Sequence, residues 1–137
     1  MLYSEMTVRD ILTLPKTVAI IGAKDKAGQP VDMVGRYLIS AGFRVLPVHP
    51  VRKGVWGLTT YTHLAEIKEP IDIVNVFRAA AYCPDHAREV LDLPTLPQCF
   101  WMQSGIRSAD AEGVFAGTKV HVIEDRCIMV EHRRLLA

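Results

Sequence analysis

Short apolar runs, separated by segments with helical periodicity, constrain the fold of this chain more than any other feature. The runs are residues 17–21, 43–48, 71–77, 98–102 and 119–123. Each is too short for a helix, and most are apolar at nearly every position, which is typical of strands buried on both faces of a parallel sheet. Their alternation with helices predicts an α/β, Rossmann-like, doubly wound fold. We expect a mainly parallel five- to six-stranded sheet with helices on both faces.

Capping and breaking residues delimit the expected helices. A leading helix should begin at Thr7, which has Asp10 at capping-box spacing, and stop at Pro15. A short strand is expected within the glycine-punctuated connection that spans residues 51–61. We predict one domain over residues 1–137, with residues 1–16 as a leading helix packed on it. Further helices are expected at 30–41, 62–67, 84–93 and 109–117, the last capped by Ser108.

Composition limits the classes of partner and the compartment. The chain of 137 residues has a formal net charge of +1 and no run of like charges, which argues against nucleic-acid and membrane partners. Its cysteines, Cys83, Cys99 and Cys127, are odd in number and form no Cys-x-x-Cys pair, which is typical of reduced thiols. No apolar stretch approaches the roughly 20 residues that cross a bilayer. We expect a cytoplasmic protein; a homodimer or a protein partner stays open.

The loop after the first strand has only part of a dinucleotide-binding pattern. Ligands of such sheets bind beyond the carboxyl ends of the strands, where the strand order reverses. Gly22 fills the first glycine position of the pattern, but Lys24 and Ala27 stand at the second and third. The following helix still offers backbone N–H groups to a phosphate. The loop is therefore either a phosphate site or a structural turn.

The loop after the second strand argues against NAD. That cofactor needs an acidic residue here to bind the ribose hydroxyls, but the sequence has His49, Arg52 and Lys53. The two cations suit an extra ribose phosphate, as in NADP or coenzyme A (CoA). A solvated pair of surface charges is the open alternative.

Arginine follows the third strand and an amide follows the fourth. Arg78 has the side chain best shaped for bidentate contact with phosphate, although a structural pairing with Asp125 is equally open. After the fourth strand, Met102, Gln103 and Gly105 are candidates to line a cleft.

Two further features near the carboxyl ends of the strands favour structural roles. Trp101 is expected in the core. Cys127, beside Arg126, is either a reactive thiol or a packed one. No histidine pair has metal-ligand spacing, and no Ser or Cys lies in a nucleophile-elbow sequence. We therefore expect no metal, no catalytic residues and no enzyme activity of the chain's own.

As a set, several segments resemble a known family. VAIIGAKDK, GFRVLPVHP, IDIVNVFR, FWMQSGI and EDRCIMVEHRRL occur in the order and spacing of the small bacterial and archaeal CoA-binding proteins. That family is also similar to the nucleotide-binding domain of the succinyl-CoA synthetase alpha subunit. The likeness covers about residues 10–135. Where the family usually has Ser and Asn, this chain has Lys24 and His49.

The resemblance implies a domain that binds CoA or an acyl-CoA, and not NAD, at the strand ends. The adenine would lie near Val48 and Pro50, and the phosphates near residues 22–26 and Arg52 or Lys53. The pantetheine arm would run toward Phe77, Arg78, Met102 and Gln103. Two alternatives stay open: a subunit of an acyl-CoA ligase or transferase that needs a partner, and a thiol or redox sensor acting through Cys127. The predicted cofactor-binding residues are Gly22, Ala23, Lys24, Asp25, Lys26, Val48, His49, Pro50, Arg52, Lys53, Phe77, Arg78, Met102, Gln103 and Gly105.

Overall fold

One parallel sheet organises the chain. The computed structural model describes residues 4–137, so the first three residues of the predicted leading segment lie outside the described residues. Every strand pair is parallel, and the order in the sheet is β2-β1-β3-β4-β5. The predicted parallel α/β fold is therefore confirmed, with five strands. The strands are β1 (Thr17–Ile21), β2 (Arg44–Val48), β3 (Ile73–Val76), β4 (Cys99–Met102) and β5 (His121–Ile123).

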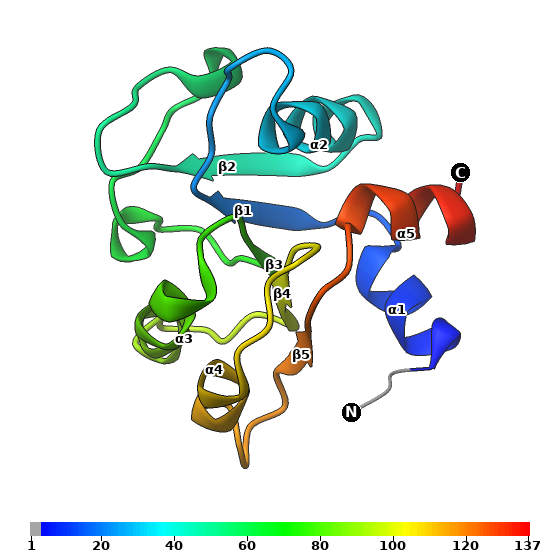
Figure 1. The fold of residues 1–137 in the computed structure, drawn as a ribbon, viewed down its shortest axis with the longest axis vertical. Helices are drawn as coiled ribbons and strands as arrows, with labels where there is room; N and C mark the ends of the chain where they lie inside the picture. The colour runs from blue at the N-terminus through cyan, green and yellow to red at the C-terminus, as the bar shows by residue number, and fades with distance from the viewer. Residues whose placement is uncertain (1–3) are drawn as a thin grey trace.

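Helices cover both faces of this sheet. In Figure 1, α1, α2 and α5 lie on one side of the strands, and α3 and α4 lie on the other. None of the helices within residues 4–137 is long and apolar enough to cross a membrane. The α-helices are α1 (Glu5–Leu12), α2 (Pro30–Ser40), α3 (Cys83–Leu91), α4 (Ala109–Val114) and α5 (Ile128–Leu135), and the 3-10 helices are η1 (Val55–Gly57), η2 (Leu64–Glu66) and η3 (Ala80–Tyr82).

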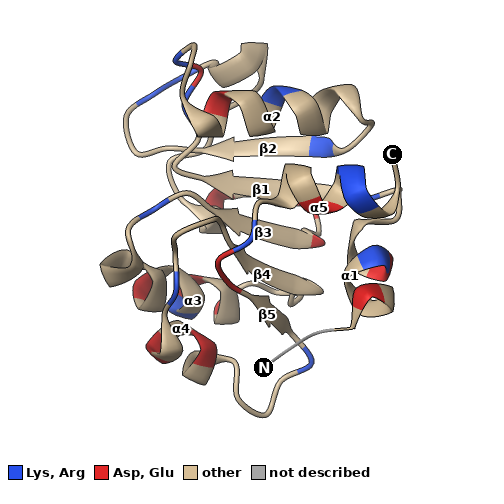
Figure 2. Cartoon of the chain, turned by 45° about the vertical axis from the view of Figure 1, so that its right-hand side comes forward, with Lys and Arg blue, Asp and Glu red and all other residues tan. Residues whose placement is uncertain are grey.

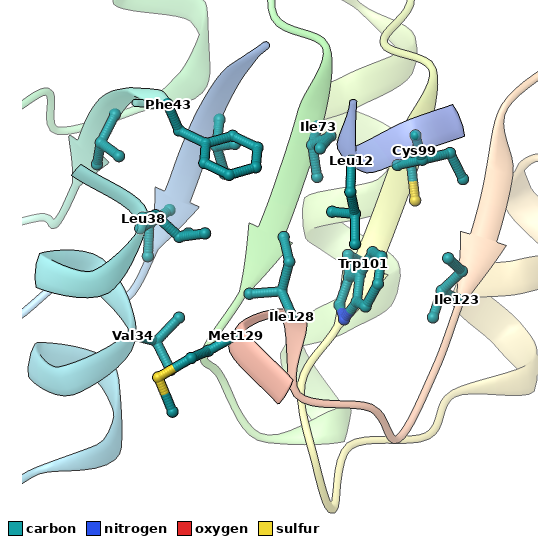
Figure 3. Close-up of a cluster of buried hydrophobic side chains, with 14 of the residues drawn as sticks. Leu12, Val34, Leu38, Phe43, Ile73, Cys99, Trp101, Ile123, Ile128 and Met129 are labelled. Atoms are coloured by element: carbon teal, nitrogen blue, oxygen red, sulfur yellow. The ribbon is translucent and has the colours of Figure 1, made fainter. Parts of the chain in front are cut away.

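Alternate residues of each strand point into two separate cores. On β4, Trp101 packs into the core beneath α1, α2 and α5, where it lies beside Leu12 (Figure 3). Its indole N–H donates to the carbonyl oxygen of Arg126 at 2.8 Å, so burial leaves no unpaired donor. Met102, expected at a cleft, lies fully buried in the opposite core. That expectation is wrong because β4 continues through Met102 and turns the side chain toward α3 and α4.

The ends of the first helix differ from the prediction. Ser4, and not Thr7, is the N-cap of α1, since its hydroxyl accepts from the Thr7 N–H at 3.1 Å. The helix ends at Leu12, before the predicted stop at Pro15. Helix α2 begins at Pro30 as predicted, because proline fits the first helical turn.

Two other segments also depart from expectation. The connection at 51–61 holds the 3-10 helix η1 and a single bridge between Val48 and Tyr61, in place of a short strand. Helix α5 was not predicted, although Ile128, Met129 and His132 form its buried stripe. Its eight residues provide few helical repeats to recognise.

Because Leu12 is fully buried between α1 and the sheet, Leu12→Ala should lower the free energy of unfolding by about 2–5 kcal/mol. Met6→Ala, on the same helix but at a side chain 81% exposed, serves as the control and should stay close to wild type. Urea denaturation measures both variants. Equal stability of the two would show that α1 does not contribute to the core.

Candidate functional site

The carboxyl ends of β1 and β3 form the switch point of the sheet. Strand β1 lies between β2 and β3, and the chain leaves β1 toward α2 on one face and β3 toward α3 on the other. Their connecting loops therefore diverge, which is the arrangement that leaves a ligand crevice in sheets of this kind. In Figure 2, Lys and Arg residues, drawn in blue, lie in the loops beyond the arrowheads of β1 and β2.

Three depressions adjoin at this edge, and Gly22 and Arg78 line all of them. The main groove, about 580 Å³, runs between the start of α2, the start of α5 and the loops after β3 and β4. The basic pocket, about 390 Å³, also includes Lys24, His49 and Pro50. The side pocket, about 230 Å³, extends past Val48 toward α3. The shared residues make these depressions one continuous surface.

Gly22 is required by the close approach of two strand ends. A Cβ atom at this position would lie 2.4 Å from the carbonyl oxygen of Phe77, and its φ is 84°. The Gly22 N–H donates to the carbonyl oxygen of Val48 at 3.0 Å. Gly22 thus fixes the junction of β1, β2 and β3 and leaves the crevice open above it.

Arg78 and Lys24 supply positive charge to the crevice. The Arg78 guanidinium lies 4.2 Å from the centre of the Tyr82 ring, a cation–π contact that holds it in place. Within residues 4–137 it forms no ion pair, and Asp125, considered as its partner, instead binds Arg107 at 2.7 Å. Lys24 is half-buried and lines both the main groove and the basic pocket.

His49 acts as a hydrogen-bond acceptor in its loop. Its Nδ1 accepts from the backbone N–H groups of Val51 at 3.0 Å and Arg52 at 2.9 Å. An asparagine side chain has an oxygen that could play the same part, which explains how histidine replaces the residue usual in the resembling family. Burial, then the charges of Arg52, Lys24 and Arg78, lower the pKa of His49 below 6.5.

A buried amide pair orients Gln103 at the floor of the main groove. Its Oε1 accepts from the Ile128 N–H at 2.9 Å and from Asn75 Nδ2 at 3.2 Å. Since a backbone N–H can only donate, the oxygen must face Ile128, and the amide nitrogen faces away from it. That Nε2 has no hydrogen-bond partner within residues 4–137, and Gln103 lines the groove. The structure thus presents one amide donor to a ligand.

The predicted site residues fall into three groups. Gly22, Lys24, Phe77, Arg78 and Gln103 line the main groove, and Val48, His49 and Pro50 line the adjoining pockets.

The second group stays at or beyond the rim of the crevice. Arg52 binds Asp25 at 3.2 Å, and both side chains are more than a third exposed. Lys26 and Lys53 are exposed, and Gly105 donates to Asp125 at 2.7 Å.

The third group, Ala23 and Met102, is fully buried and lines none of the three depressions.

Sequence reasoning missed most of the groove walls. Val31 and Val34 come from α2, and Met129 comes from α5, where its side chain lies close to Val34 (Figure 3). Asn75 could have been identified from the sequence as a residue with a special role, because it is a polar residue inside an otherwise apolar strand. Within the described part of the chain, no group of three or more acidic, His or Cys side chains could hold a metal ion.

The lowered pKa of His49 can be tested by NMR titration of its imidazole. In Arg52→Ala, loss of the neighbouring charge should raise this pKa partway toward 6.5, while Lys26→Ala should leave it unchanged. His49 binds a proton more readily in the unfolded chain than in the folded protein. Its contribution should therefore lower the free energy of unfolding as the pH falls below 6.5, the ordinary pKa of histidine. A wild-type His49 pKa at or above 6.5 would contradict this account.

Comparisons with known proteins show the family and the fold of this chain. Residues 16–133 match the family described as CoA binding domain. The uncharacterized protein YneT of Bacillus subtilis (strain 168) is 34% identical over 129 residues, which cover 94% of each chain. A solved structure from Thermus thermophilus is 40% identical, with a TM-score of 0.90 over 98% of this chain and 100% of that chain. A hypothetical protein from Pyrococcus horikoshii OT3 is 26% identical, with a TM-score of 0.92 over 98% of this chain and 94% of that chain. The chain therefore belongs to the CoA binding domain family, as its sequence motifs predicted.

Proposed function

We propose that this protein binds CoA or an acyl-CoA as a module without catalytic residues of its own. The observation that carries the proposal is the continuity of the three depressions through Gly22 and Arg78. One end of this surface is cationic and the other is walled by apolar side chains. CoA is complementary to this surface, because its nucleotide is anionic and its pantetheine arm is uncharged.

The nucleotide would occupy the basic pocket and the side pocket. Lys24 and Arg78 would contact the phosphates, each contributing about 1.5–3 kcal/mol where water is excluded. The start of α2 also adjoins the main groove at Gln29 and Pro30, so the positive end of the helix dipole favours an anion there. Arg52 stands at the rim, bound to Asp25, and would reach a ribose phosphate only by leaving that exposed pair.

The pantetheine arm would occupy the main groove. Val31, Val34 and Met129 give it an apolar wall, and burial of apolar surface favours the uncharged arm. Gln103 Nε2 would donate to one of the amide carbonyls of the arm. This assignment moves Met102 out of the site and replaces it with residues of α2 and α5.

The loop after β2 supports CoA over NAD. The residues that follow the strand are His49, Pro50 and Val51, none of which offers the carboxylate that binds both ribose hydroxyls of NAD. A role as a partner-dependent subunit of an acyl-CoA ligase or transferase, and self-association, stay open as alternatives, and a cytoplasmic location stays an expectation from the sequence.

A thermal-shift panel tests the choice of ligand. CoA and acetyl-CoA should raise the melting temperature in proportion to their affinity, since they bind only the folded state. NAD and NADP at equal concentration should raise it less, because neither has the arm that fills the main groove. A shift with NAD as large as that with CoA would contradict the proposal.

Calorimetry of charge variants tests the phosphate contacts. Arg78→Ala and Lys24→Ala should each weaken CoA binding by about tenfold or more, because each removes a charge-assisted contact. Lys26→Ala is the matched control, since Lys26 belongs to the same loop but is exposed and lines none of the three depressions. Unchanged affinity in both variants, with melting temperatures like wild type, would overturn the assignment.

A further inference from the structure

We propose that Trp56 is a positioning residue for the candidate site: it anchors the β2 loop (residues 49–57) to α2 and so holds one wall of the basic pocket in the geometry that receives a phosphorylated nucleotide. The inference rests on the proposed function and extends it. It assigns the preformed shape of the nucleotide end to a residue that lines none of the three depressions.

The backbone of Trp56 has a conformation that side chains rarely adopt. Its φ is 55° and its ψ is 25°, in the left-handed region, where a bulky residue is an outlier. Gly54 and Gly57 have φ values of 62° and 75°, which glycine adopts without strain. Among these three residues, Trp56 is therefore the strained one. Such strain persists only where surrounding contacts enforce it, and it is typical of functional sites.

Two contacts with α2 enforce this conformation. The indole ring lies against Gly35, where a Cβ atom would be 2.2 Å from both Cη2 and Cζ2 of the ring. Its Nε1 donates to Asp32 Oδ1 at 2.8 Å. Asp32 is only 5% exposed, and Arg36 Nε donates to its two carboxylate oxygens at 2.9 and 3.1 Å. Because Asp32 and Gly35 are three residues apart on the helix, they form one surface that receives the ring.

The anchor joins two walls of the candidate site. The β2 loop carries His49 and Pro50, which line the basic pocket. Helix α2 carries Val31 and Val34, which line the main groove. The contact of Trp56 with α2 therefore fixes the position of the nucleotide end of the site relative to the end proposed for the arm.

A second tie between the β2 loop and the site is weaker. Arg52 binds Asp25 at 3.2 Å, but both side chains are more than a third exposed, and such pairs contribute little to stability. By contrast, Val55 is fully buried in the core beneath α2, and Trp56, next to it, packs against the same core. The buried attachment at residues 55 and 56 thus determines where the start of the loop lies.

Anchoring matters for affinity because only one position of the loop forms the pocket. If the β2 loop moved among several positions, the observed affinity would be reduced to the fraction of molecules in the competent position. A loop that is already held in place avoids this loss. The strain at Trp56 is then the cost of a preformed site.

NMR titration of the His49 imidazole tests the anchor without a ligand. Burial and neighbouring positive charges lower the pKa of His49 in the folded protein. Trp56→Leu should raise this pKa toward 6.5, because a released loop exposes the imidazole and moves it away from those charges. Leu12→Ala, which should lower stability at a core position on α1, is the control and should leave the pKa unchanged. A wild-type His49 pKa in a folded Trp56→Leu variant would overturn the inference.

Calorimetry with two ligands localises the effect to the nucleotide end. Trp56→Leu should weaken binding of CoA and of adenosine 3′,5′-bisphosphate, which lacks the arm, by the same factor. That factor should be about tenfold if the released loop occupies the competent position about a tenth of the time. Leu12→Ala should bind both ligands like wild type. Unchanged affinity in folded Trp56→Leu, or a loss seen with CoA alone, would overturn the inference.

Gly35→Ala tests the same contact from the side of α2. The added methyl group would displace the ring, although alanine itself favours a helix more than glycine does. This variant should raise the pKa of His49 and weaken CoA binding as Trp56→Leu does, and it carries the test where Trp56→Leu fails to fold. The double variant should lose no more than either single variant, because both remove one contact. Additive losses would overturn the inference.

The inference and the proposed function fail in different ways. Absence of CoA binding by the wild type would overturn the proposed function, while the His49 titration would still decide whether Trp56 holds the loop. Equal binding of CoA by the wild type and by folded Trp56→Leu would overturn only the role of Trp56.

Discussion

The close contact between the ends of β1 and β3 is the constraint on which the rest of the site depends. At Gly22, a Cβ atom would lie 2.4 Å from the carbonyl oxygen of Phe77, so the two strand ends meet only if this residue has no side chain. The Gly22 N–H also binds Val48 at the end of β2. Three strands thus end at one point, and their loops must diverge to opposite faces of the sheet. The crevice is a consequence of this divergence.

Positive charge is concentrated at that point of the sheet. Arg78 and Lys24 both line the basic pocket, and together with Arg52 they lower the pKa of His49. The neutral imidazole adds no further positive charge and instead accepts two backbone hydrogen bonds. The chain as a whole carries a net charge of only +1, so the attraction for anions is local.

How far the sequence predicts this structure depends on whether a feature is local. Strand β1 and helix α2 follow from a β-branched run and a proline at the first turn, and Gly22, Arg78 and Gln103 follow because each lies just after a strand. The walls of the groove could not be predicted in this way. Val31 and Met129 face it only because α2 and α5 pack side by side, which is a tertiary property. The misplacement of Met102 has the same origin, since one more residue of strand turns a side chain to the other face.

Asn75 shows how a polar residue in the middle of a sheet can serve the edge. It lies on β3, fully buried, and its Oδ1 has no partner within the described residues, which is a cost to stability. Its Nδ2 binds Gln103 Oε1, and the same oxygen receives the Ile128 N–H. An apolar residue at position 75 would avoid the cost but would remove one of the two donors that hold this amide. The strand therefore gives up packing energy to keep Gln103 in one orientation, and through Ile128 it also fixes the start of α5 against the groove.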